Sequence, residues 1–342
     1  MTAPDIQAMQ DMLSNAFDEA GLTCFCFDHY PAVYRRYGAG MTFERKAQAL
    51  LNHCRQKQTL ANLQQRLNGH HLGPDFATRS PDTFPLTDAL LADPAARVSP
   101  NPGPNPFGLT GRITNPAHFF DREGLLRQIF EELDKGVSLS LVGESQVGKS
   151  SLLEMICRLG PARMAKPPQT FAHLSLQWVA NEADFYEALC DALEIEPLRG
   201  YRLFRALRQR RFILCLDEAE KMTWEGFTRD LRGHLRGLAD GVEASMTLVI
   251  ASRTPLETLF QDRPDMDSPL AGICRQLDVA NFPLEVARAF LSHHLNQTGV
   301  TFSPAQNEAL LAWSHGHPAR LHRAAADLFR ALTDSSSITR NS

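Results

Sequence analysis

Small and basic residues between positions 137 and 151 have the types and spacing that bind the phosphates of a nucleoside triphosphate. Four residues separate Gly143 from the tripeptide Gly-Lys-Ser at 148–150. Glycines let the backbone curl so that successive N–H groups face an anion, and a following helix adds the positive end of its dipole. Lys149 would then reach the β- and γ-phosphates, and the Ser150 hydroxyl would bind Mg²⁺.

The residues on either side of this loop, which we call the P-loop (residues 143–151), predict the elements that hold it. The preceding residues 137–142 form an apolar run suited to a buried strand, and apolar residues of 152–159 recur at helical spacing. Strand, glycine loop and helix start are the context that this motif requires. The P-loop residues expected to bind the nucleotide are Gly143, Glu144, Ser145, Gln146, Val147, Gly148, Lys149, Ser150 and Ser151.

A pair of acidic residues provides the second half of the predicted site. Residues 211–216 (Arg-Phe-Ile-Leu-Cys-Leu) read as an apolar strand that ends directly before Asp217 and Glu218. Asp217 is placed to hold Mg²⁺ together with Ser150. Glu218 is placed to orient or deprotonate the attacking water. Glu220 is interpreted as a solvated neighbour.

Composition favours a soluble cytoplasmic protein of about two domains. The chain has 342 residues, of which 43% are hydrophobic and 22% charged, with a net charge of −4 and a pI near 6.3. This balance provides no reason to expect nucleic acid or an anionic membrane as partner. No run approaches the ~18 apolar residues of a membrane span, and the N-terminus lacks the regions of a signal peptide. The seven cysteines are scattered, as is typical of free thiols in a reducing cytosol.

Residues 1–75 predict a small bundle of four or five short helices. The apolar residues that share helical faces are Ile6, Met9, Leu13 and Phe17, then Phe43, Ala47, Leu50, Leu51 and Cys54, then Leu60, Leu63 and Leu67. In the segments 17–22, 25–28, 45–51 and 60–67 this module resembles the effector-associated domains of bacterial conflict systems, which are death-like adaptor bundles. The resemblance implies that it binds a like domain on an effector protein. A helical cap without a partner is the alternative.

Proline dominates the segment that follows. Residues 76–112 are expected to be a linker, and the run Pro-Asn-Pro-Gly-Pro-Asn-Pro at 100–106 should be extended and stiff, holding the domains apart. At the other end of the chain, the Ser-rich residues 334–342 predict a disordered tail.

The segment 115–123 (Asn-Pro-Ala-His-Phe-Phe-Asp-Arg-Glu) resembles the "F-x-G-R-E" opening of STAND and AAA+ ATPases. In those families the arginine helps to hold the bound nucleotide, and Arg122 matches it here. Asp121 stands where glycine is usual, which leaves the local backbone path open. Capping or pairing at the surface is the alternative role of Arg122.

The segments 233–238 and 247–259 resemble bacterial STAND ATPases, in which a helix with "H-L-R-x-L" precedes a strand ending in "A-S-R-x-P-L". The resemblance implies that residues 246–251 form the strand between the P-loop strand and the Asp217 strand. Ser252 and Arg253 would then lie near the γ-phosphate as sensors, the alternative being an ordinary polar pair at a strand end.

The predicted helix 224–238 also carries arginines at spacings of three and four. Arg229, Arg232 and Arg236 would form a basic stripe that contacts nucleic acid or a neighbour's phosphate, or else a solvated face.

From residue 283 onward the pattern is helical, with a break at His315-Gly-His-Pro318. This break resembles the "G-x-P" element of the lid of STAND and archaeal ATPases, whose proline lies against the adenine, and Pro318 matches it. His315 and His317 are interpreted as turn residues because no further ligands complete a metal site.

Together these features predict an α/β fold, a P-loop three-layer sandwich with a mostly parallel sheet and a helical lid, plus a small all-α N-terminal bundle. The expected divisions are an adaptor at 1–75, a linker at 76–112, an NTPase core at 113–282, a lid at 283–333 and a tail at 334–342.

The resemblance implies a STAND-type signalling switch with slow, regulatory ATP hydrolysis, ATP or ADP and Mg²⁺ as cofactors, and a role in bacterial antiphage defence or regulated cell death. Its partner would be an effector such as a protease or other toxin, with homo-oligomerisation possible, nucleic acid unexpected and no membrane involved. A DNA-associated AAA+ ATPase, supported by the arginine stripe, and a non-hydrolysing nucleotide-bound scaffold stay open as alternatives.

Overall fold

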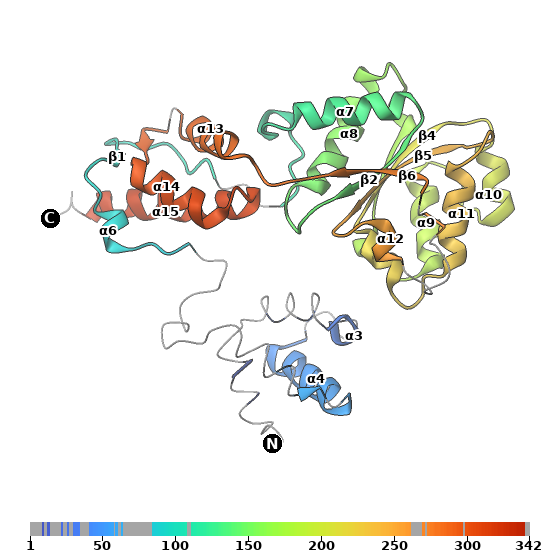
Figure 1. The fold of residues 1–342 in the computed structure, drawn as a ribbon, viewed down its shortest axis with the longest axis horizontal. Helices are drawn as coiled ribbons and strands as arrows, with labels where there is room; N and C mark the ends of the chain where they lie inside the picture. Colours follow the sequence, from blue (N-terminus) through green and yellow to red (C-terminus); the bar gives the residue numbers. More distant parts are fainter. Residues whose placement is uncertain are drawn as a thin grey trace. The chain divides into compact units, whose positions relative to one another are not determined.

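The chain divides into two compact units, Met1–Pro85 and Leu86–Ser342, shown in a computed structural model (Figure 1). The structure describes residues 9, 12–13, 22, 26, 30–34, 41–57, 59–60, 63, 84–107, 111–260, 269–270, 272–296 and 298–338. None of the helices in this described part combines the length and the hydrophobicity that a membrane span needs.

The N-terminal unit has a buried cluster drawn from several short segments. Its described helices are α3 (Pro31–Tyr34) and α4 (Phe43–Gln56). Seven residues predicted to share helical faces are buried together: Met9, Leu13, Ala47, Leu50, Leu51, Cys54 and Leu63. Those predicted at positions 6, 17 and 67 lie outside the described residues. The periodicity therefore identified the core of this unit.

A five-stranded parallel sheet organises the larger unit, with strand order β3-β4-β5-β2-β6 (Figure 1). The strands are β2 (Ser138–Val142), β3 (Phe171–Ser175), β4 (Phe212–Asp217), β5 (Met246–Ser252) and β6 (Cys274–Asp278). Because β5 pairs with both β2 and β4, the predicted place of strand 246–251 is confirmed. Parallel pairing brings the carboxyl ends of the strands to one edge, where the P-loop and Asp217 both lie.

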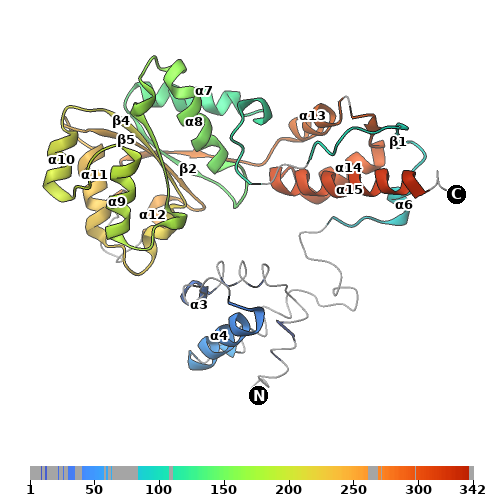
Figure 2. The same cartoon turned by 180° about the vertical axis from the view of Figure 1, so that it is seen from behind.

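Helices cover both faces of the sheet (Figure 2). The larger unit's core helices are α7 (Glu123–Asp134), α8 (Lys149–Arg163), α9 (Glu182–Ala192), α10 (Gly200–Leu207), α11 (Arg229–Ala239) and the short α12 (Leu256–Leu259). Ile213 and Cys215 of β4 pack with α7 and α8, whereas Leu214 and Leu216 pack with α9 to α11. This alternation buries β4 on both faces, as expected of a central parallel strand. The predicted three-layer sandwich is confirmed.

Three helices form the lid: α13 (Leu284–Leu295), α14 (Pro304–Ser314) and α15 (Pro318–Ile338). Ser303 begins α14 with a capping box, since its side chain accepts from the Gln306 N–H while the Gln306 side chain accepts from the Ser303 N–H. Residues 334–338, expected in a disordered tail, continue α15, and 339–342 lie outside the described residues.

The segment 86–107, expected within a stiff linker, packs along the lid, and we call it the strap. It contains α6 (Asp88–Leu91) and β1 (Arg97–Val98), and β1 pairs antiparallel with β7 (Val300–Thr301) of the lid. The N–H groups of Ser99 and Gly103 donate to the carbonyls of Gly299 and Thr298, both at 2.7 Å. Its prolines alternate with residues whose N–H groups are free to donate, so a proline-rich segment still forms an edge pairing.

Side chains fasten the strap as well. Phe107 is only 1% exposed and stacks with Phe302 and with His294 of α13. It also meets His322 of α15 edge-on, at 5.8 Å between ring centroids. The Asn105 amide donates to the Ala326 carbonyl at 2.9 Å. The lid core is therefore completed by a residue from the strap.

The buried histidines of this lid core should make the free energy of unfolding depend on pH. Burial and, to a smaller extent, the charge of nearby His294 lower the pKa of His322 to about 4. The unfolded chain takes up this proton near pH 6.5, so protons favour the unfolded state between about pH 6.5 and about pH 4. We therefore expect the free energy of unfolding to fall as the pH is lowered through this window. Urea titrations at about pH 7.5 and about pH 5 would show a smaller fall in His322→Phe, and an equal fall would contradict the assignment.

Candidate nucleotide site

The P-loop curls tightly because two of its positions require glycine. A side chain on Gly143 would place its Cβ 2.4 Å from the Val279 carbonyl oxygen. Gly148, which directly precedes α8, has φ 108°. Gln146 between them has φ 60°, a conformation uncommon for residues other than glycine. Such curvature ahead of a helix N-terminus is what a phosphate cradle requires.

The Lys149 ammonium lies within this curve. Its Nζ donates to the carbonyl oxygens of Gly143 and Glu144, both at 2.7 Å. Burial lowers the pKa of Lys149, and the carboxylate of Glu220 opposes that shift. The structure thus places the lysine beside the acids of the site, while its contact with phosphate stays a prediction.

Asp217 lies on the same sheet edge as the P-loop. It ends β4, is 7% exposed, and accepts a hydrogen bond from the Glu218 N–H at 3.0 Å. The charge of Asp217 partly offsets the fall in the Lys149 pKa that burial causes. A serine hydroxyl at 150 and a carboxylate at 217 are hard oxygen ligands, so the donor set fits Mg²⁺.

Glu218 is held in an unusual conformation at the turn after β4. Its φ of 59° and ψ of 49° are left-handed, which costs a non-glycine residue roughly 1–2 kcal/mol. Burial raises the pKa of Glu218, and the charges of Asp217 and Glu220 raise it further. Strain and a raised pKa at a carboxylate are both common where a residue acts as a general base.

Glu220 is better connected than expected from the sequence. Its carboxylate accepts a hydrogen bond from the backbone N–H of Arg253, at the end of β5. The short 3₁₀ helix Ala219–Thr223 turns the chain back toward β5 and makes this contact possible. No sequence pattern signals such a return, because the two residues are far apart in the chain. Glu220 therefore joins the acidic turn to the predicted sensor turn.

The predicted sensors Ser252 and Arg253 lie on the expected edge, next to the P-loop. The N–H of Gly143 donates to the carbonyl of Ser252 at 3.2 Å. The buried Ser252 hydroxyl donates to the carbonyl of Thr254 at 2.7 Å, so it stabilises its own turn. A direct role of either residue in sensing γ-phosphate stays a prediction.

Arg122 connects the P-loop to the segment that leads into the lid. Its Nη2 donates to the carbonyls of Val147 at 3.1 Å and Ala280 at 2.9 Å, and the guanidinium lies over the Phe282 ring. Asp121 has φ 47°, so it adopts the left-handed conformation that glycine would supply at this position. Contact of Arg122 with nucleotide stays a prediction.

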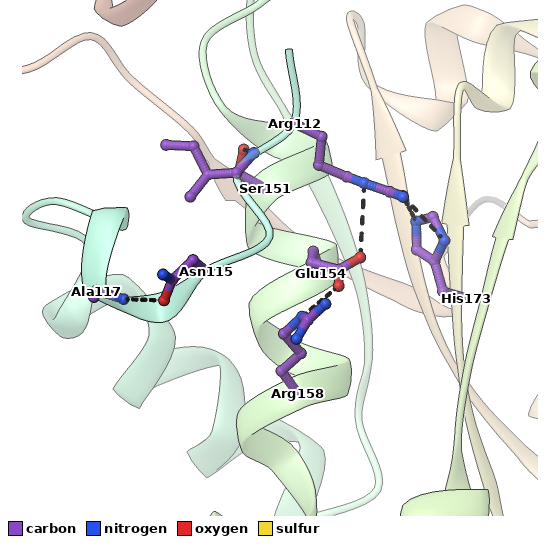
Figure 3. Close-up of polar contacts among 8 residues, drawn as sticks. Arg112, Asn115, Ala117, Ser151, Glu154, Arg158 and His173 are labelled. Atoms are coloured by element: carbon purple, nitrogen blue, oxygen red, sulfur yellow. Dashed lines mark hydrogen bonds and ion pairs between the residues drawn. The ribbon is translucent and has the colours of Figure 1, made fainter. Parts of the chain in front are cut away.

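The segment leading into α7 is fastened to the P-loop helix by polar contacts (Figure 3). The Ile113 N–H donates to the Ser151 hydroxyl at 3.0 Å, so this P-loop side chain holds the chain that passes it. Arg112 pairs with Glu154 at 3.6 Å and contacts the His173 ring on β3. Burial lowers the pKa of His173, and Arg112 lowers it further.

The lid also touches the P-loop. His317, interpreted from the sequence as a turn residue, is 4% exposed, and its Nε2 lies 2.9 Å from the Ser145 carbonyl oxygen. Pro318 follows as the first residue of α15, and its contact with adenine stays a prediction. His315 has φ 49° and caps α14. Spacing did not distinguish the two histidines, because only the packing of the lid decides which one faces the loop.

The arginine stripe of α11 is largely engaged within the molecule. Arg232 is 3% exposed, donates to the Met222 carbonyl at 3.0 Å and lies over the Phe260 ring. Arg236 donates to the Pro269 carbonyl and pairs with Asp240. Arg236 stays exposed beside an acid, as the solvated-face interpretation expects. The buried guanidinium of Arg232 interrupts the basic stripe on which the DNA-associated alternative rested.

Each of the two units is similar to known proteins. Residues 9–69 match the family model for effector-associated domain 7. A search of curated proteins finds no match. Among solved structures, the Walker-type ATPase of Pyrococcus abyssi is similar with a TM-score of 0.52 and 20% identity, over 69% of this chain and 76% of that chain. Cdc6p of Pyrobaculum aerophilum is similar with a TM-score of 0.48 and 17% identity, over 71% and 68%.

At these identities the structural likeness establishes the fold alone. The parallel sheet, the P-loop and the flanking helices are those of P-loop ATPases. The N-terminal match independently identifies the module that precedes them. The chain therefore joins an effector-associated domain to a P-loop ATPase fold.

Proposed function

We propose that this chain is an ATP-dependent signalling switch of the STAND type that recruits or activates an effector through its N-terminal domain. The observation that carries the proposal is the presence, in one chain, of an effector-associated domain and a P-loop whose lid contacts it. A nucleotide bound at the P-loop can bias the position of such a lid, and an adaptor on the same chain can report it.

The residues would divide the chemistry as follows. Backbone N–H groups of the P-loop and the Lys149 ammonium bind the phosphates of ATP. The Ser150 hydroxyl and the Asp217 carboxylate would hold Mg²⁺, which supplies neutralisation of phosphate charge. Glu218 accepts a proton from the attacking water, and its raised pKa suits it to do so. Hydrolysis would be slow and would reset the switch.

The strap supports a route from the lid to the N-terminal domain. Residues 86–107 directly follow the smaller unit and are fixed to the lid by the β1–β7 pair and by Phe107. A lid that moves would carry the strap, which follows the N-terminal unit in the chain. ATP would favour one lid position only by the difference between its affinities for the two states.

The biological setting we propose is bacterial antiphage defence or regulated cell death in the cytoplasm, with a protease or another toxin as effector. Among the residues that the structure describes, Cys54, Cys157, Cys190, Cys215 and Cys274 are free thiols, as suits a reducing compartment. Homo-oligomerisation is compatible with this role.

Recruitment can be tested by purifying the full chain from its native cells in the presence of ATP. We expect a protein that itself carries an effector-associated domain to be recovered with the full chain. When residues 1–75 are deleted, its recovery should fall about tenfold or more, which corresponds to a loss of about 1.4 kcal/mol of binding free energy. ATP affinity of the deleted chain should stay unchanged, because residues 86–342 form their own compact unit. Undiminished recovery after deletion would refute the adaptor role.

A further inference from the structure

His317 lies between α14 and α15, and several contacts restrain its backbone and its ring. Gly316, with φ 72°, packs so closely on the segment before α13 that a Cβ there would lie 2.2 Å from the Phe282 carbonyl oxygen. The Phe282 N–H donates to the Gly316 carbonyl at 2.9 Å. The Arg320 N–H points at His317 Nδ1 at 3.4 Å. These contacts fix the ring from its backbone and from α15.

The same contacts assign the tautomer of the ring. Nδ1 faces a backbone N–H and so acts as an acceptor. Nε2 faces the Ser145 carbonyl oxygen at 2.9 Å and so carries the proton that it donates. Burial lowers the pKa of His317, which keeps the ring neutral and compatible with both roles. The charge of Arg320 lowers this pKa further, and the charge of Glu144 opposes the shift.

The oxygen that accepts this hydrogen bond belongs to the peptide unit that joins Ser145 to Gln146. A trans peptide is planar, and its C=O and N–H point in opposite directions. A donor that holds the Ser145 carbonyl on the lid side therefore holds the Gln146 N–H on the opposite side of that plane. Gln146 is also the P-loop residue with φ 60°, so this peptide's orientation depends on a conformation that needs support.

We propose that His317 is a positioning residue for phosphate binding, acting from the lid through the Ser145–Gln146 peptide. The proposal builds on the proposed nucleotide function and adds its regulation by lid position. With the lid docked, the Nε2 donor orients the Gln146 N–H for a phosphate oxygen. With the lid displaced, that peptide loses its external support and the affinity of the P-loop for phosphate falls. By reciprocity, bound phosphate favours the docked lid.

A pair of isosteric variants isolates the Nε2 hydrogen bond. The amide nitrogen of His317→Gln can occupy the place of Nε2, whereas the shorter amide of His317→Asn reaches only the place of Nδ1. We expect the Asn variant to bind both ATP and inorganic tripolyphosphate about five- to tenfold more weakly, as suits the loss of one hydrogen bond, and the Gln variant to recover most of that loss. Titration calorimetry on the full chain measures both ligands.

Equal loss for both ligands is the readout that a merely structural role would not produce. If His317 only stabilised the lid and did not orient the P-loop peptide, its replacement would cost only the predicted contact of the lid with adenine, which would weaken ATP binding and leave tripolyphosphate binding unchanged. His322→Gln is the matched control, because His322 lies on the same helix within the lid core. It should alter stability without altering affinity for tripolyphosphate.

Several outcomes would overturn the proposal. One is affinity like that of the unaltered chain in His317→Asn, and another is an equal loss in the Gln and Asn variants. A third measurement needs no variant: the ¹⁵N chemical shifts of the His317 ring should identify the Nε2–H tautomer, and the opposite tautomer would exclude the donor role. If Lys149→Ala left ATP binding intact, the proposed nucleotide function itself would fail, which is distinguishable from failure at His317.

Discussion

Lys149→Ala is expected to weaken ATP binding by a factor of about a hundred or more, equivalent to about 3 kcal/mol. The ammonium lies inside the curve of the P-loop, at 2.7 Å from two of its carbonyl oxygens. A triphosphate in that curve would gain charge-assisted hydrogen bonds from Lys149, which are about twice as strong as neutral ones. Removing the ammonium also leaves the negative charges of Asp217 and Glu220 unopposed beside an anionic ligand.

Titration calorimetry with ATP and Mg²⁺ measures this loss. Lys135→Ala is a matched control, since it removes the same charge. Lys135 directly follows α7 and pairs with Glu132. That variant should bind ATP like the unaltered chain. Thermal unfolding of both variants would show whether the larger unit stays folded. Equal affinity of the Lys149 variant and the control would mean that the P-loop is not the nucleotide site.

Much of the sheet could be predicted because its strands are buried on both faces. Residues 212–216 are a continuous apolar run before acidic residues, and residues 138–142 are a run of leucine, valine and small serines before a glycine, so the length and the type of both strands could be predicted. The order of the strands was available only through the family resemblance, which placed 246–251 between them, and the pairing of β5 confirms it. Local pattern thus predicted the elements, and resemblance predicted their arrangement.

The elements that were missed lie at edges. The strand β6 contains Arg275, Gln276 and Asp278, and three of its five residues are exposed, so no apolar pattern marks it. The strap pairs through only two residues of β1, in a segment where proline suggested a spacer. Both elements form because a partner strand was already in place, which is a property of the fold rather than of the segment.

The site followed the same rule. Lys149 and Asp217 stand in local motifs and were predicted from spacing; the structure places them at the start of α8 and the end of β4, and their roles stay predictions. Glu220 and His317 were not predicted from spacing, because each acts on backbone that is distant in the sequence: the N–H of Arg253 and the carbonyl of Ser145. The prediction for Arg232 was wrong in the opposite sense. Its periodic spacing suggested a surface position, whereas its guanidinium is buried. Periodicity reports a face of a helix, and tertiary packing decides what covers it.

Glu218→Gln is expected to lower the rate of ATP hydrolysis by about a hundredfold to ten-thousandfold, the range typical of a lost general base. ATP affinity should change little, because the amide keeps the shape of the side chain and removes a negative charge that would face the phosphates. Glu218 is suited to the role by its raised pKa, which burial causes, and by a strained turn that presents it beside Asp217.

Glu220→Gln separates the two carboxylates of this turn. The Glu220 side chain accepts from the Arg253 N–H, and a glutamine oxygen can accept the same hydrogen bond, so turnover should fall far less than in Glu218→Gln. Single-turnover hydrolysis and nucleotide affinity would be measured for both variants. A large loss only in the Glu220 variant would transfer the role of base to that residue. Unchanged turnover in both would favour the scaffold alternative, in which the nucleotide holds the lid and the P-loop together without being consumed.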